Sequence, residues 1–454
     1  MQSDERPCAL VILAAGQGTR MNSDLPKVLH PLGGAPLVVH AMQAGATLAP
    51  ERTIVVVGHG GALVEKAVRA HDADAICVTQ AEQLGTGHAA QQAAPALEGF
   101  EGDVIVLYGD TPFISEDTLA RMLAARAAHD IVVLGFEAAE PGRYGRLVME
   151  GDRLARIVEA KDASSDELAI TLCNSGLMAA DAATLMGLLA EVGNDNASGE
   201  YYLTDVPAIA ATKGLTATAV TCDEAETLGI NTRAELAGAE TLFQSRKRAE
   251  AMENGATLVA PETVFFAHDT YLGRDVTVEQ NVVFGPGVTV ENDAQIRAFS
   301  HLEGCHIGAR AIVGPYARLR PGAELGNDAK IGNFVEVKSA EIGEGAKVNH
   351  LSYIGDAEIG EGSNIGAGSI TCNYDGVFKH RTTVGRDVFI GSNTMLVAPV
   401  TVGDGAMTGS GSVITSDVPA GDMALGRAKQ VNKTGLGARL MARLRAMKAS
   451  EKGQ

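Results

Sequence analysis

The sequence predicts an α/β protein in two parts, a doubly wound N-terminal domain followed by a parallel β-helix of hexapeptide repeats. Between residues 8 and 136, short apolar runs alternate with segments of helical pattern, which is typical of a buried parallel sheet covered by helices. Between residues 272 and 414, an aliphatic residue returns every six residues, a period that fits neither a helix nor a two-sided strand. With 454 residues, the chain is long enough for more than one domain.

The N-terminal half is expected to contain buried strands connected by helices. The expected strands are 8–13, 53–57, 75–78, 103–108 and 131–136, and the expected helices lie near 36–49, 61–71, 84–97 and 115–129. In a doubly wound sheet, ligands bind at the carboxyl ends of the strands. The loops that follow these strands are therefore the expected location of a binding site.

A single helix is expected to connect the two parts. Thr232 and Glu235 have the spacing of a capping box, and Gly255 is placed to end the helix. Between them, one side of the helix is apolar: Leu236, Ala239, Leu242, Phe243, Ala249 and Met252. We therefore expect an N-terminal domain over residues 1–231, a linker helix over 232–255 and a C-terminal domain over 256–454.

The six-residue repeat predicts which side chains fill the β-helix. The large inward residues are Leu272, Val278, Phe284, Val290, Ile296, Leu302, Ile307, Val313, Leu319, Leu325, Ile331, Val337, Ile342, Val348, Ile354, Ile359, Ile365, Val384, Ile390, Leu396, Val402 and Ile414. Four residues later the side chain is usually small, as at Ala294, Ala311 and Ser363. Glycines directly follow several large positions, where we expect sharp corners to favour a residue without Cβ. A sandwich of short strands would instead need two-residue alternation and hairpin signals, which are absent.

Composition and charge exclude several classes of protein. The net charge of −19 argues against nucleic-acid binding. The segment 427–454 is the exception, with eight Lys and Arg residues and one acid, and we interpret it as a basic helix that rests on the acidic body. The six cysteines show no paired spacing, so we expect reduced thiols in a cytoplasmic protein. Residues 8–15 form only a short apolar run, so we expect no signal peptide and no membrane partner.

A loop of small residues directly follows the first expected strand. Residues 13–21 read Leu-Ala-Ala-Gly-Gln-Gly-Thr-Arg-Met, so backbone N–H groups can face phosphates and Arg20 adds positive charge. The loop is not a Walker motif and lacks the third glycine of the dinucleotide fingerprint. By itself it is equally compatible with a plain strand-to-helix turn. The segments 25–30, 80–87 and 108–110 also follow expected strands or lie in loops.

Together, these motifs resemble those of the sugar-1-phosphate nucleotidyltransferases. With the β-helix included, nearly the whole chain resembles the bacterial family of bifunctional N-acetylglucosamine-1-phosphate uridyltransferase/glucosamine-1-phosphate acetyltransferases. The resemblance implies a Rossmann-like nucleotidyltransferase domain, a left-handed β-helix with a short C-terminal helix, and a homotrimer. It also implies acetyl transfer from acetyl-CoA to glucosamine-1-phosphate, then uridylyl transfer from UTP to N-acetylglucosamine-1-phosphate. The product, UDP-N-acetylglucosamine, would feed peptidoglycan and lipopolysaccharide precursor synthesis.

The resemblance assigns the uridyltransferase residues one by one. Lys27 is expected to neutralise the triphosphate together with Arg20, and Asp110 and Asn231 to hold Mg²⁺, which prefers hard oxygen ligands. The nucleotide is expected to contact Leu13, Ala14, Ala15, Gly16, Gln80, Gly85, Thr86, Tyr108 and Gly109, and the sugar to contact Gly145, Glu159, Asn174 and Thr204. Taken singly, Lys27 could be a solvated lysine, Asp110 a turn former and Asn231 an ordinary cap. As an ordered set they favour a site.

The β-helix carries the expected acetyltransferase residues. His350 lies two positions after the inward-facing Val348, so it should point outward, where a histidine can accept the proton of the attacking amine. Glu336 is the expected partner that orients its imidazole. The repeat is interrupted between 371 and 384, and such insertions often build the binding face of a solenoid. The backbone of Tyr374, in this interruption, is a candidate oxyanion donor.

The resemblance adds the ligand contacts of this second site. Arg320, Lys338 and Tyr353 are expected to hold the sugar phosphate, and Asn364 and Asn373 to contact the sugar. The expected acetyl-CoA contacts are Ala367, Asn373, Tyr374, Ser392, Ser410 and Arg427. Ser410 departs from the family pattern, in which we expect alanine, so only that contact is in doubt.

Three other functions were weighed against this hypothesis. In ADP-glucose pyrophosphorylase the β-helix is regulatory, but a regulatory domain has no need of His350, Arg320 and Lys338 together. A non-catalytic scaffold with the same two domains would not need Lys27 and Asp110. A zinc-dependent carbonic anhydrase of the γ type is disfavoured, because the spacing of the histidines supplies no convincing set of three ligands: His301, His306, His350 and His380.

Overall fold

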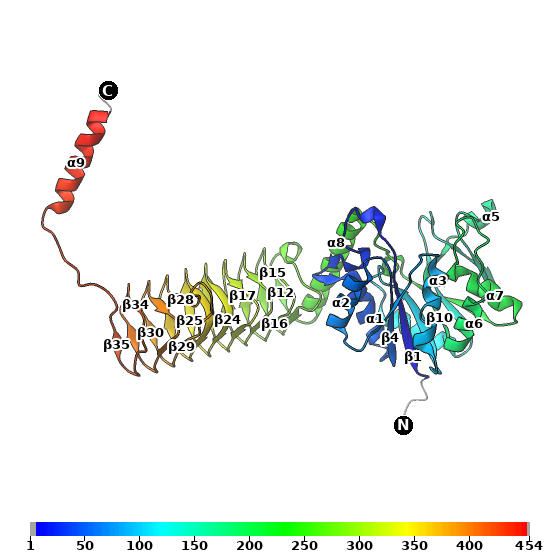
Figure 1. Ribbon diagram of the computed structural model, residues 1–454, viewed down its shortest axis with the longest axis horizontal. Coiled ribbons are helices and arrows are strands. Elements are labelled where there is room, and N and C mark those ends of the chain that lie inside the picture. Colours follow the sequence, from blue (N-terminus) through cyan, green and yellow to red (C-terminus); the bar gives the residue numbers. More distant parts are fainter. Residues whose placement is uncertain (1–5, 452–454) are drawn as a thin grey trace. The chain divides into compact units, whose positions relative to one another are not determined.

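The computed structural model describes residues 6–451 (Figure 1). The chain forms two compact units. The first contains the described residues up to Ala249 together with Phe266–His268, and the second contains Glu250–Phe265 and the described chain from Asp269 onward. No helix among the described residues is long and apolar enough to cross a membrane.

The first unit is built on a mixed sheet. Its main strands lie in the order β11 (Ala217–Cys222), β7 (Ile131–Glu137), β10 (Leu172–Asp181), β6 (Asp103–Tyr108), β1 (Cys8–Ala14), β4 (Arg52–Val57) and β5 (Ile76–Thr79). All five strands expected from the sequence occur, with ends that differ by at most one residue. The sequence analysis did not identify β10, which runs antiparallel to β6 and β7, or the hairpin of β8 (Arg146–Glu150) and β9 (Arg153–Val158) attached to it.

The helices of this unit follow the expected alternation, with one break. They are α1 (Leu37–Ala46), α2 (Gly61–His71), α3 (Thr86–Gln91), α4 (Glu116–Arg126), α5 (Ser165–Leu168), α6 (Ala182–Leu189) and α7 (Val206–Thr212). The single helix expected over 84–97 is divided into α3 and a 3₁₀ turn, η3 (Ala94–Leu97), because Pro95 has no backbone N–H to continue an α-helix. Short 3₁₀ turns, η1 (Thr19–Met21), η2 (Lys27–Leu29), η4 (Leu203–Asp205) and η5 (Glu224–Glu226), lie in the connections.

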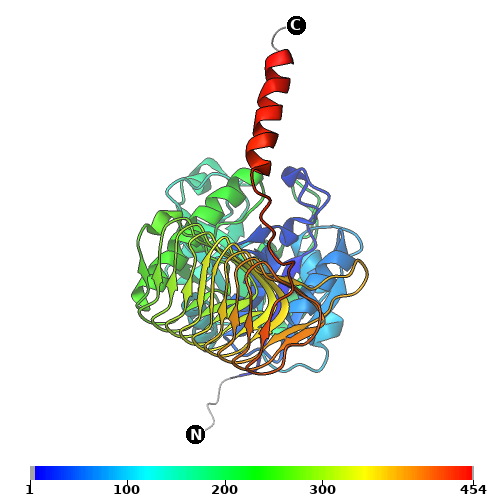
Figure 2. The same cartoon turned by 90° about the vertical axis from the view of Figure 1, so that its left-hand side faces the viewer.

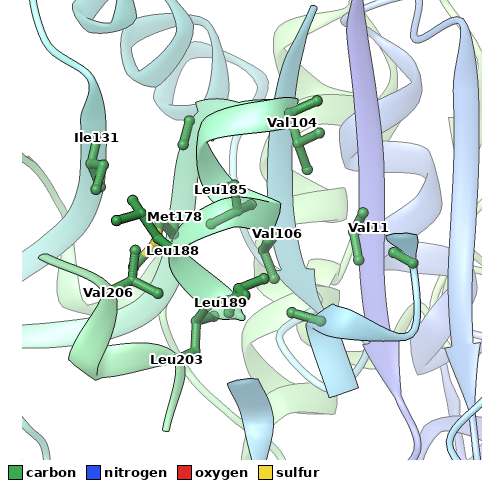
Figure 3. Packing of buried hydrophobic residues seen from close by; sticks show 14 of the residues in the cluster. Val11, Val104, Val106, Ile131, Met178, Leu185, Leu188, Leu189, Leu203 and Val206 are labelled. Carbon is green, nitrogen blue, oxygen red and sulfur yellow. The ribbon is translucent and has the colours of Figure 1, made fainter. Parts of the chain in front are cut away.

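Both faces of the sheet are buried. On one face, Val11, Val104 and Val106 of the sheet pack with Leu185 and Leu188 of α6, and all five side chains are at most 2 % exposed (Figure 3). The opposite face packs against residues of α1, α2 and α4. Burial on both faces explains why the strands have continuous apolar sequences, and it leaves the strand ends as the place for polar function.

The helix α8 (Arg233–Glu253) begins with the expected capping box. The Thr232 hydroxyl accepts from the Glu235 N–H at 3.2 Å, and the Glu235 carboxylate accepts from the Thr232 N–H at 2.9 Å. Ala239 and Phe243 are buried with Leu32 of the first unit, while Met252 is 44 % exposed. Most of this helix therefore packs against the first unit.

The second unit is a parallel β-helix with three faces. Figure 2 views the stack of its coils from one end. The first face consists of β12 (Thr257–Leu258), β14 (Thr277–Val278), β17 (Gln295–Ile296), β20 (Ile312–Val313), β23 (Lys330–Asn333), β25 (Lys347–His350), β27 (Asn364–Ile365), β30 (Phe389–Ile390), β33 (Met407–Thr408) and β35 (Met423–Ala424). The strands β24 (Glu336–Ile342) and β26 (Tyr353–Ile359) turn a corner, so each pairs on both of the other faces.

The other two faces are formed in the same way. The second contains β15 (Val283–Phe284), β18 (His301–Leu302), β21 (Arg318–Leu319), β28 (Ile370–Cys372), β31 (Met395–Val397) and β34 (Val413–Ile414). The third contains β13 (Tyr271–Leu272), β16 (Val288–Val290), β19 (Cys305–Ile307), β22 (Ala323–Leu325), β29 (Thr382–Val384) and β32 (Val400–Val402). After the last coil, α9 (Leu436–Glu451) forms the expected C-terminal helix, and its Leu440, Leu444 and Met447 are at least half exposed.

The interior of the β-helix matches the sequence repeat. Every large position expected to face inward is at most 9 % exposed. The glycines after these positions have a different role from the one expected. A Cβ on Gly332 would collide with the Asn349 carbonyl of the next coil, and one on Gly360 would collide with the Gly385 carbonyl, although neither glycine has a positive φ. Glycine is therefore needed for the close approach of successive coils.

Candidate active sites

One candidate site is a hollow at the carboxyl ends of β1 and β6. This hollow is lined by ten of the residues that the sequence analysis assigned to the nucleotide or to the metal ion: Leu13, Ala14, Ala15, Gly16, Lys27, Gln80, Gly85, Thr86, Tyr108 and Asp110. Sequence reasoning did not identify Gln83 and Glu200, which line it as well. Gly109 supports the loop, since its N–H donates to the Leu13 carbonyl at 3.0 Å. Arg20 is exposed on η1 and is not among the lining residues.

Lys27 occupies the polar centre of this hollow. Its ammonium donates to the Asp110 carboxylate and, at 3.0 Å, to Oδ1 of Asn231. The Lys27 and Asp110 side chains are only 13 % and 16 % exposed. The fold thus brings the two predicted magnesium ligands to one cationic atom. No group of three His, Cys, Asp or Glu residues in the described chain could hold a metal, so an ion here would need further oxygen ligands from substrate or water.

The residues predicted to contact the sugar form a second cluster. The Thr204 hydroxyl donates to Glu159 Oε1 at 3.1 Å, and the Asn174 N–H donates to the Gly145 carbonyl at 2.8 Å. Burial raises the pKa of Glu159, and the hydrogen bond from Thr204 partly opposes this. A Cβ on Gly145 would lie 3.5 Å from Glu159 Oε1, so Gly145 lies directly beside this carboxylate.

An irregularity in β10 joins the two clusters. The register of β10 against β7 shifts between Asn174 and Met178, and such bulges re-aim side chains. Gly176, within the shift, packs so closely on the Tyr108 ring that a Cβ would collide with it. Burial raises the pKa of Tyr108, as do the charges of Asp110 and Glu159. Tyr108 therefore lies between the two clusters.

The loop from Gln80 to Gly87 is held against the segment that follows Glu200. The Gly87 N–H donates to the Tyr201 carbonyl, and the Tyr201 N–H donates to the Leu84 carbonyl, both at 2.8 Å. The Leu203 N–H donates to the Thr86 hydroxyl at 3.1 Å. Gly85 has a φ of 114°, and a Cβ there would lie 2.6 Å from the Tyr201 carbonyl oxygen. Only glycine fits this position.

Gly85→Ala is expected to impair the nucleotide site and to spare the β-helix. The added Cβ must displace the Tyr201 backbone, so we expect the catalytic efficiency of uridylyl transfer to fall by at least about tenfold, mainly through a higher KM for UTP. Steady-state kinetics would measure this change. Gly99→Ala is the matched control, because Gly99 also has a positive φ but its Cβ would meet no atom within 4 Å. Equal losses in the two variants would contradict this role of Gly85.

The second candidate site surrounds His350 on β25. His350 is exposed, as expected. Its Nδ1 lies 2.8 Å from Oδ1 of Asn333, one coil earlier. Glu336, the expected partner, instead accepts a hydrogen bond from Arg320 at 2.8 Å. Within this chain the imidazole is therefore oriented by an amide from the neighbouring coil, which sequence reasoning missed because only the pairing of β23 with β25 aligns the two residues.

The residues predicted to hold the sugar phosphate are joined by another cation. The adjacent Lys338 ammonium lowers the pKa of Lys379, and the charge of the Asp356 carboxylate opposes this. Asn373 donates to the Asp356 carboxylate and, at 3.4 Å, to the Tyr353 hydroxyl. Two adjacent ammonium groups favour an anion between them. Sequence reasoning missed Lys379 because it lies in the interruption of the repeat, where no periodicity places it.

This interruption is a closed hairpin. The Asp375 carboxylate accepts the Val377 and Phe378 N–H groups at 2.8 and 2.7 Å and lies 2.7 Å from Nε2 of His380. The bond with His380 and those from the backbone lower the pKa of Asp375 to about 2. Tyr374 pairs with Lys379 across the hairpin, and its side chain is 61 % exposed.

The residues predicted to contact acetyl-CoA follow one another on successive coils. The Ala367 carbonyl accepts from Asn393 N–H at 2.7 Å, and the Ser392 carbonyl accepts from Gly411 N–H at 2.8 Å. The Ser410 carbonyl then accepts from the Arg427 guanidinium at 2.8 Å. Since Gly368 N–H donates to the His350 carbonyl at 3.1 Å, this row begins at His350.

Comparisons with known proteins agree with both halves of the chain. Residues 10–174 match the model of a MobA-like NTP transferase domain, and residues 304–339 and 381–416 match the bacterial transferase hexapeptide (six repeats). Proteins described as bifunctional protein GlmU are similar over nearly the whole length. That of Jannaschia sp. (strain CCS1) is 67 % identical over 99 % of each chain, and that of Roseobacter denitrificans is 65 % identical over 98 % of each.

Proposed function

Because this chain belongs to the family of bifunctional GlmU proteins, it is a bifunctional transferase that makes UDP-N-acetylglucosamine, and we propose which residues carry each activity. The hollow around Lys27 performs uridylyl transfer, and the surface around His350 performs acetyl transfer. The observation that carries this division is the convergence of Lys27, Asp110 and Asn231 on one point within the first unit, far along the sequence from His350 in the second. Assays of one purified protein with acetyl-CoA and with UTP would test it.

In the acetyl-transfer site, His350 is the general base. The Asn333 oxygen can only accept a hydrogen bond, so Nδ1 of His350 carries the proton and Nε2 keeps a free lone pair. The amine of glucosamine-1-phosphate attacks the thioester carbonyl of acetyl-CoA, and Nε2 takes the proton that the amine loses. The thiolate of CoA leaves and takes this proton back from the His350 imidazolium, so that free CoA is released as the thiol. The Tyr374 backbone N–H is the candidate donor to the oxyanion.

The surrounding residues position the two substrates. Arg320, Lys338, Lys379 and the Tyr353 hydroxyl bind the sugar phosphate, and Glu336 holds the Arg320 guanidinium in place. Asn364 and Asn373 contact the sugar. Acetyl-CoA lies along the row of Ala367, Ser392, Ser410 and Arg427. Ser410 in place of alanine is compatible with this role, because the contact with Arg427 uses its backbone carbonyl.

In the uridylyl-transfer site, a phosphate oxygen of N-acetylglucosamine-1-phosphate attacks the α-phosphorus of UTP, and pyrophosphate leaves. The protein mainly positions the reactants and neutralises charge. The 13–16 loop and Lys27 bind the phosphates, Gln80, Gly85 and Thr86 bind the uracil, and the cluster around Glu159 binds the sugar. The oxygens of Asp110 and Asn231 would hold Mg²⁺, which supplies further charge neutralisation when bound.

The β-helix also carries an exposed apolar stripe, which we assign to the contact between copies in a homotrimer. Phe299, Tyr316, Phe334 and Leu351 follow one another on successive coils and are 46–62 % exposed. The Phe299 and Tyr316 rings stack with centroids 4.9 Å apart, and Tyr316 and Phe334 stack at 5.3 Å. Contiguous exposed apolar surface is typical of an interface. The stripe ends beside His350, so a second copy there would adjoin the acetyl-transfer site.

Tyr316→Asp is expected to weaken the assembly by placing charges in this contact. Tyr316 has a φ of 57°, a conformation that Asp tolerates, so the backbone is not strained. Sedimentation velocity should show at least a tenfold weaker association and acetyl transfer should fall more than uridylyl transfer. Leu63→Asp, at a 53 % exposed site on α2 of the first unit, is the control. A Tyr316→Asp protein that sediments like the control would exclude the stripe as the contact.

A further inference from the structure

His88, a residue with no role assigned above, contacts the buried side chain of Gln80. His88 lies on α3, and Gln80 directly follows β5. Gln80 is only 4 % exposed and lines the nucleotide hollow. Its Nε2 lies 3.2 Å from the Gly85 carbonyl oxygen and 3.0 Å from Nδ1 of His88.

These two contacts determine what Gln80 can offer a ligand. The Gly85 carbonyl can only accept a hydrogen bond, so it must face the amide nitrogen of Gln80 and not the amide oxygen. The second N–H of the same nitrogen then points to Nδ1 of His88, which must accept it. Both N–H groups are used, and the carbonyl oxygen is the group left for a ligand. Gln80 therefore presents an acceptor.

The orientation of the Gln80 amide depends on which ring nitrogen of His88 carries the proton. Nδ1 can accept only while it is unprotonated, so the proton of the neutral ring must sit on Nε2. Nε2 lies 3.2 Å from Nε2 of Gln92, which also donates to the His88 carbonyl at 3.0 Å, so an amide nitrogen faces each ring nitrogen. A neutral ring can accept at only one of them. The acceptor belongs to Gln80, because an N–H without an acceptor costs more on the 4 % exposed Gln80 than on the half-buried Gln92. If Nδ1 gained a proton, it would repel the Gln80 N–H. The amide could then satisfy His88 only by turning its oxygen toward the ring. This would present a donor to the ligand and face the amide oxygen toward the Gly85 carbonyl oxygen, which would keep only the Ala89 N–H at 3.0 Å.

We propose that His88 is a positioning residue for base selection: its unprotonated Nδ1 holds Gln80 so that the hollow accepts a base with an N–H at its pairing edge. This rests on the proposed function, in which Gln80 meets the base of the nucleotide. Uracil has an N–H at N3, whereas cytosine has a bare acceptor nitrogen there. An acceptor on Gln80 therefore binds UTP and rejects CTP, and this discrimination decreases when His88 is replaced by a residue that cannot accept.

The surroundings of His88 contain few other titratable groups. The elements packed against α3 are α6, η4 and β1. Their titratable residues are Asp205 on η4 and Cys8 at the start of β1, and the segment before η4 contributes Glu200 and Tyr201. The Tyr201 ring centroid is 6.3 Å from that of His88. No carboxylate in the described chain forms a hydrogen bond with the His88 ring that would hold both its nitrogens protonated.

Two substitutions of His88 test whether its hydrogen-bond acceptor is the group that positions Gln80. His88→Leu removes the acceptor, and we expect the KM for UTP to rise about tenfold, the preference for UTP over CTP in kcat/KM to fall about tenfold, and kcat to change less than threefold. His88→Asn retains an acceptor oxygen near the position of Nδ1 and has no ring nitrogen that could be protonated. It should restore both the KM and the preference at pH 8.

Rescue by asparagine provides the second readout, because a merely structural role of His88 would not be restored by an acceptor oxygen at one ring position. Gln92→Ala, which removes the other ring contact, should follow the unmodified protein. Thermal unfolding of each variant would verify that it is folded.

The outcomes distinguish this proposal from the one on which it rests. An unchanged UTP preference in folded His88→Leu, or a folded His88→Asn protein that loses as much of the preference as His88→Leu, would overturn the role of His88. Gln80→Ala tests the underlying assignment. If it leaves the KM for UTP unchanged, Gln80 does not meet the base, and the proposed function of the hollow fails at that residue whatever His88 does.

Discussion

His350→Ala should lower the kcat of acetyl transfer by about 10²–10⁴-fold, the usual contribution of a general base, and leave uridylyl transfer within about twofold. The attacking amine must lose a proton as it forms the amide bond, and alanine cannot accept it. His350 is exposed and its side-chain contact is with Asn333, so its removal leaves the core of the β-helix intact. Initial rates with acetyl-CoA and with UTP, measured on one preparation, would provide both numbers.

Asn333→Ala is the informative companion to this variant. It removes the oxygen that holds the proton on Nδ1 of His350, so the ring can adopt the tautomer in which Nε2 is protonated and cannot act as a base. We expect an intermediate loss of about tenfold, and the larger loss of His350→Ala should not grow further when Asn333 is also replaced. If His350→Ala removed both activities in a folded protein, the division into two sites would be wrong. If it removed neither, another group would be the base.

Lys27→Ala should affect the other activity: uridylyl transfer should fall by a factor similar to the loss of acetyl transfer in His350→Ala. We expect uridylyl transfer to fall by about 10²–10³-fold, because a preorganised positive charge at the phosphates is lost from a partly enclosed site, while acetyl transfer stays within about twofold. The Lys27 ammonium is also the described side-chain partner of both Asp110 and Asn231. Its loss leaves the Asp110 carboxylate without that partner in a site where it is only 16 % exposed.

A further variant separates the loss of the Lys27 charge from the loss of the space that its side chain fills. Lys27→Met retains most of the length of the side chain without the charge, so it should lose as much activity as Lys27→Ala if charge is the reason. Asp110→Asn removes the predicted metal ligand's charge, and it should raise the Mg²⁺ concentration needed for half-maximal uridylyl transfer. A Lys27→Met protein with near-normal uridylyl transfer would show that Lys27 only fills space.

The periodic parts of the fold were predictable because their burial pattern is local. The strands from Cys8 to Glu137 have uninterrupted apolar sequences, since helices cover both faces of their sheet. The hexad positions of the β-helix are buried without exception. The strands β8–β11 were not predicted. Polar and small residues such as Asn174, Ser175 and Gly176 interrupt β10 at its bulge, so no clean period marks it.

The candidate sites were predictable as residue types and not as contacts. The motifs containing Lys27, Asp110 and Asn231 were each visible in the sequence. Their convergence on one ammonium depends on β6, η2 and the start of α8 meeting at one edge of the sheet. The partner of His350 could not be inferred in this way. Asn333 and Glu336 lie within a few residues of one another, and only the register of β23 against β25 selects Asn333.

The sequence alone therefore determined the two domain folds, the inward face of the β-helix and the resemblance that identifies the family, because these depend on which side chains avoid water. The tertiary structure decided which polar atoms meet: Lys27 with two oxygens, Glu336 with Arg320, Lys338 with Lys379, and His88 with Gln80. Whether a hydrogen bond or ion pair forms between residues remote in the chain depends on differences of a few tenths of an ångström in their separation, and no local sequence pattern records that separation.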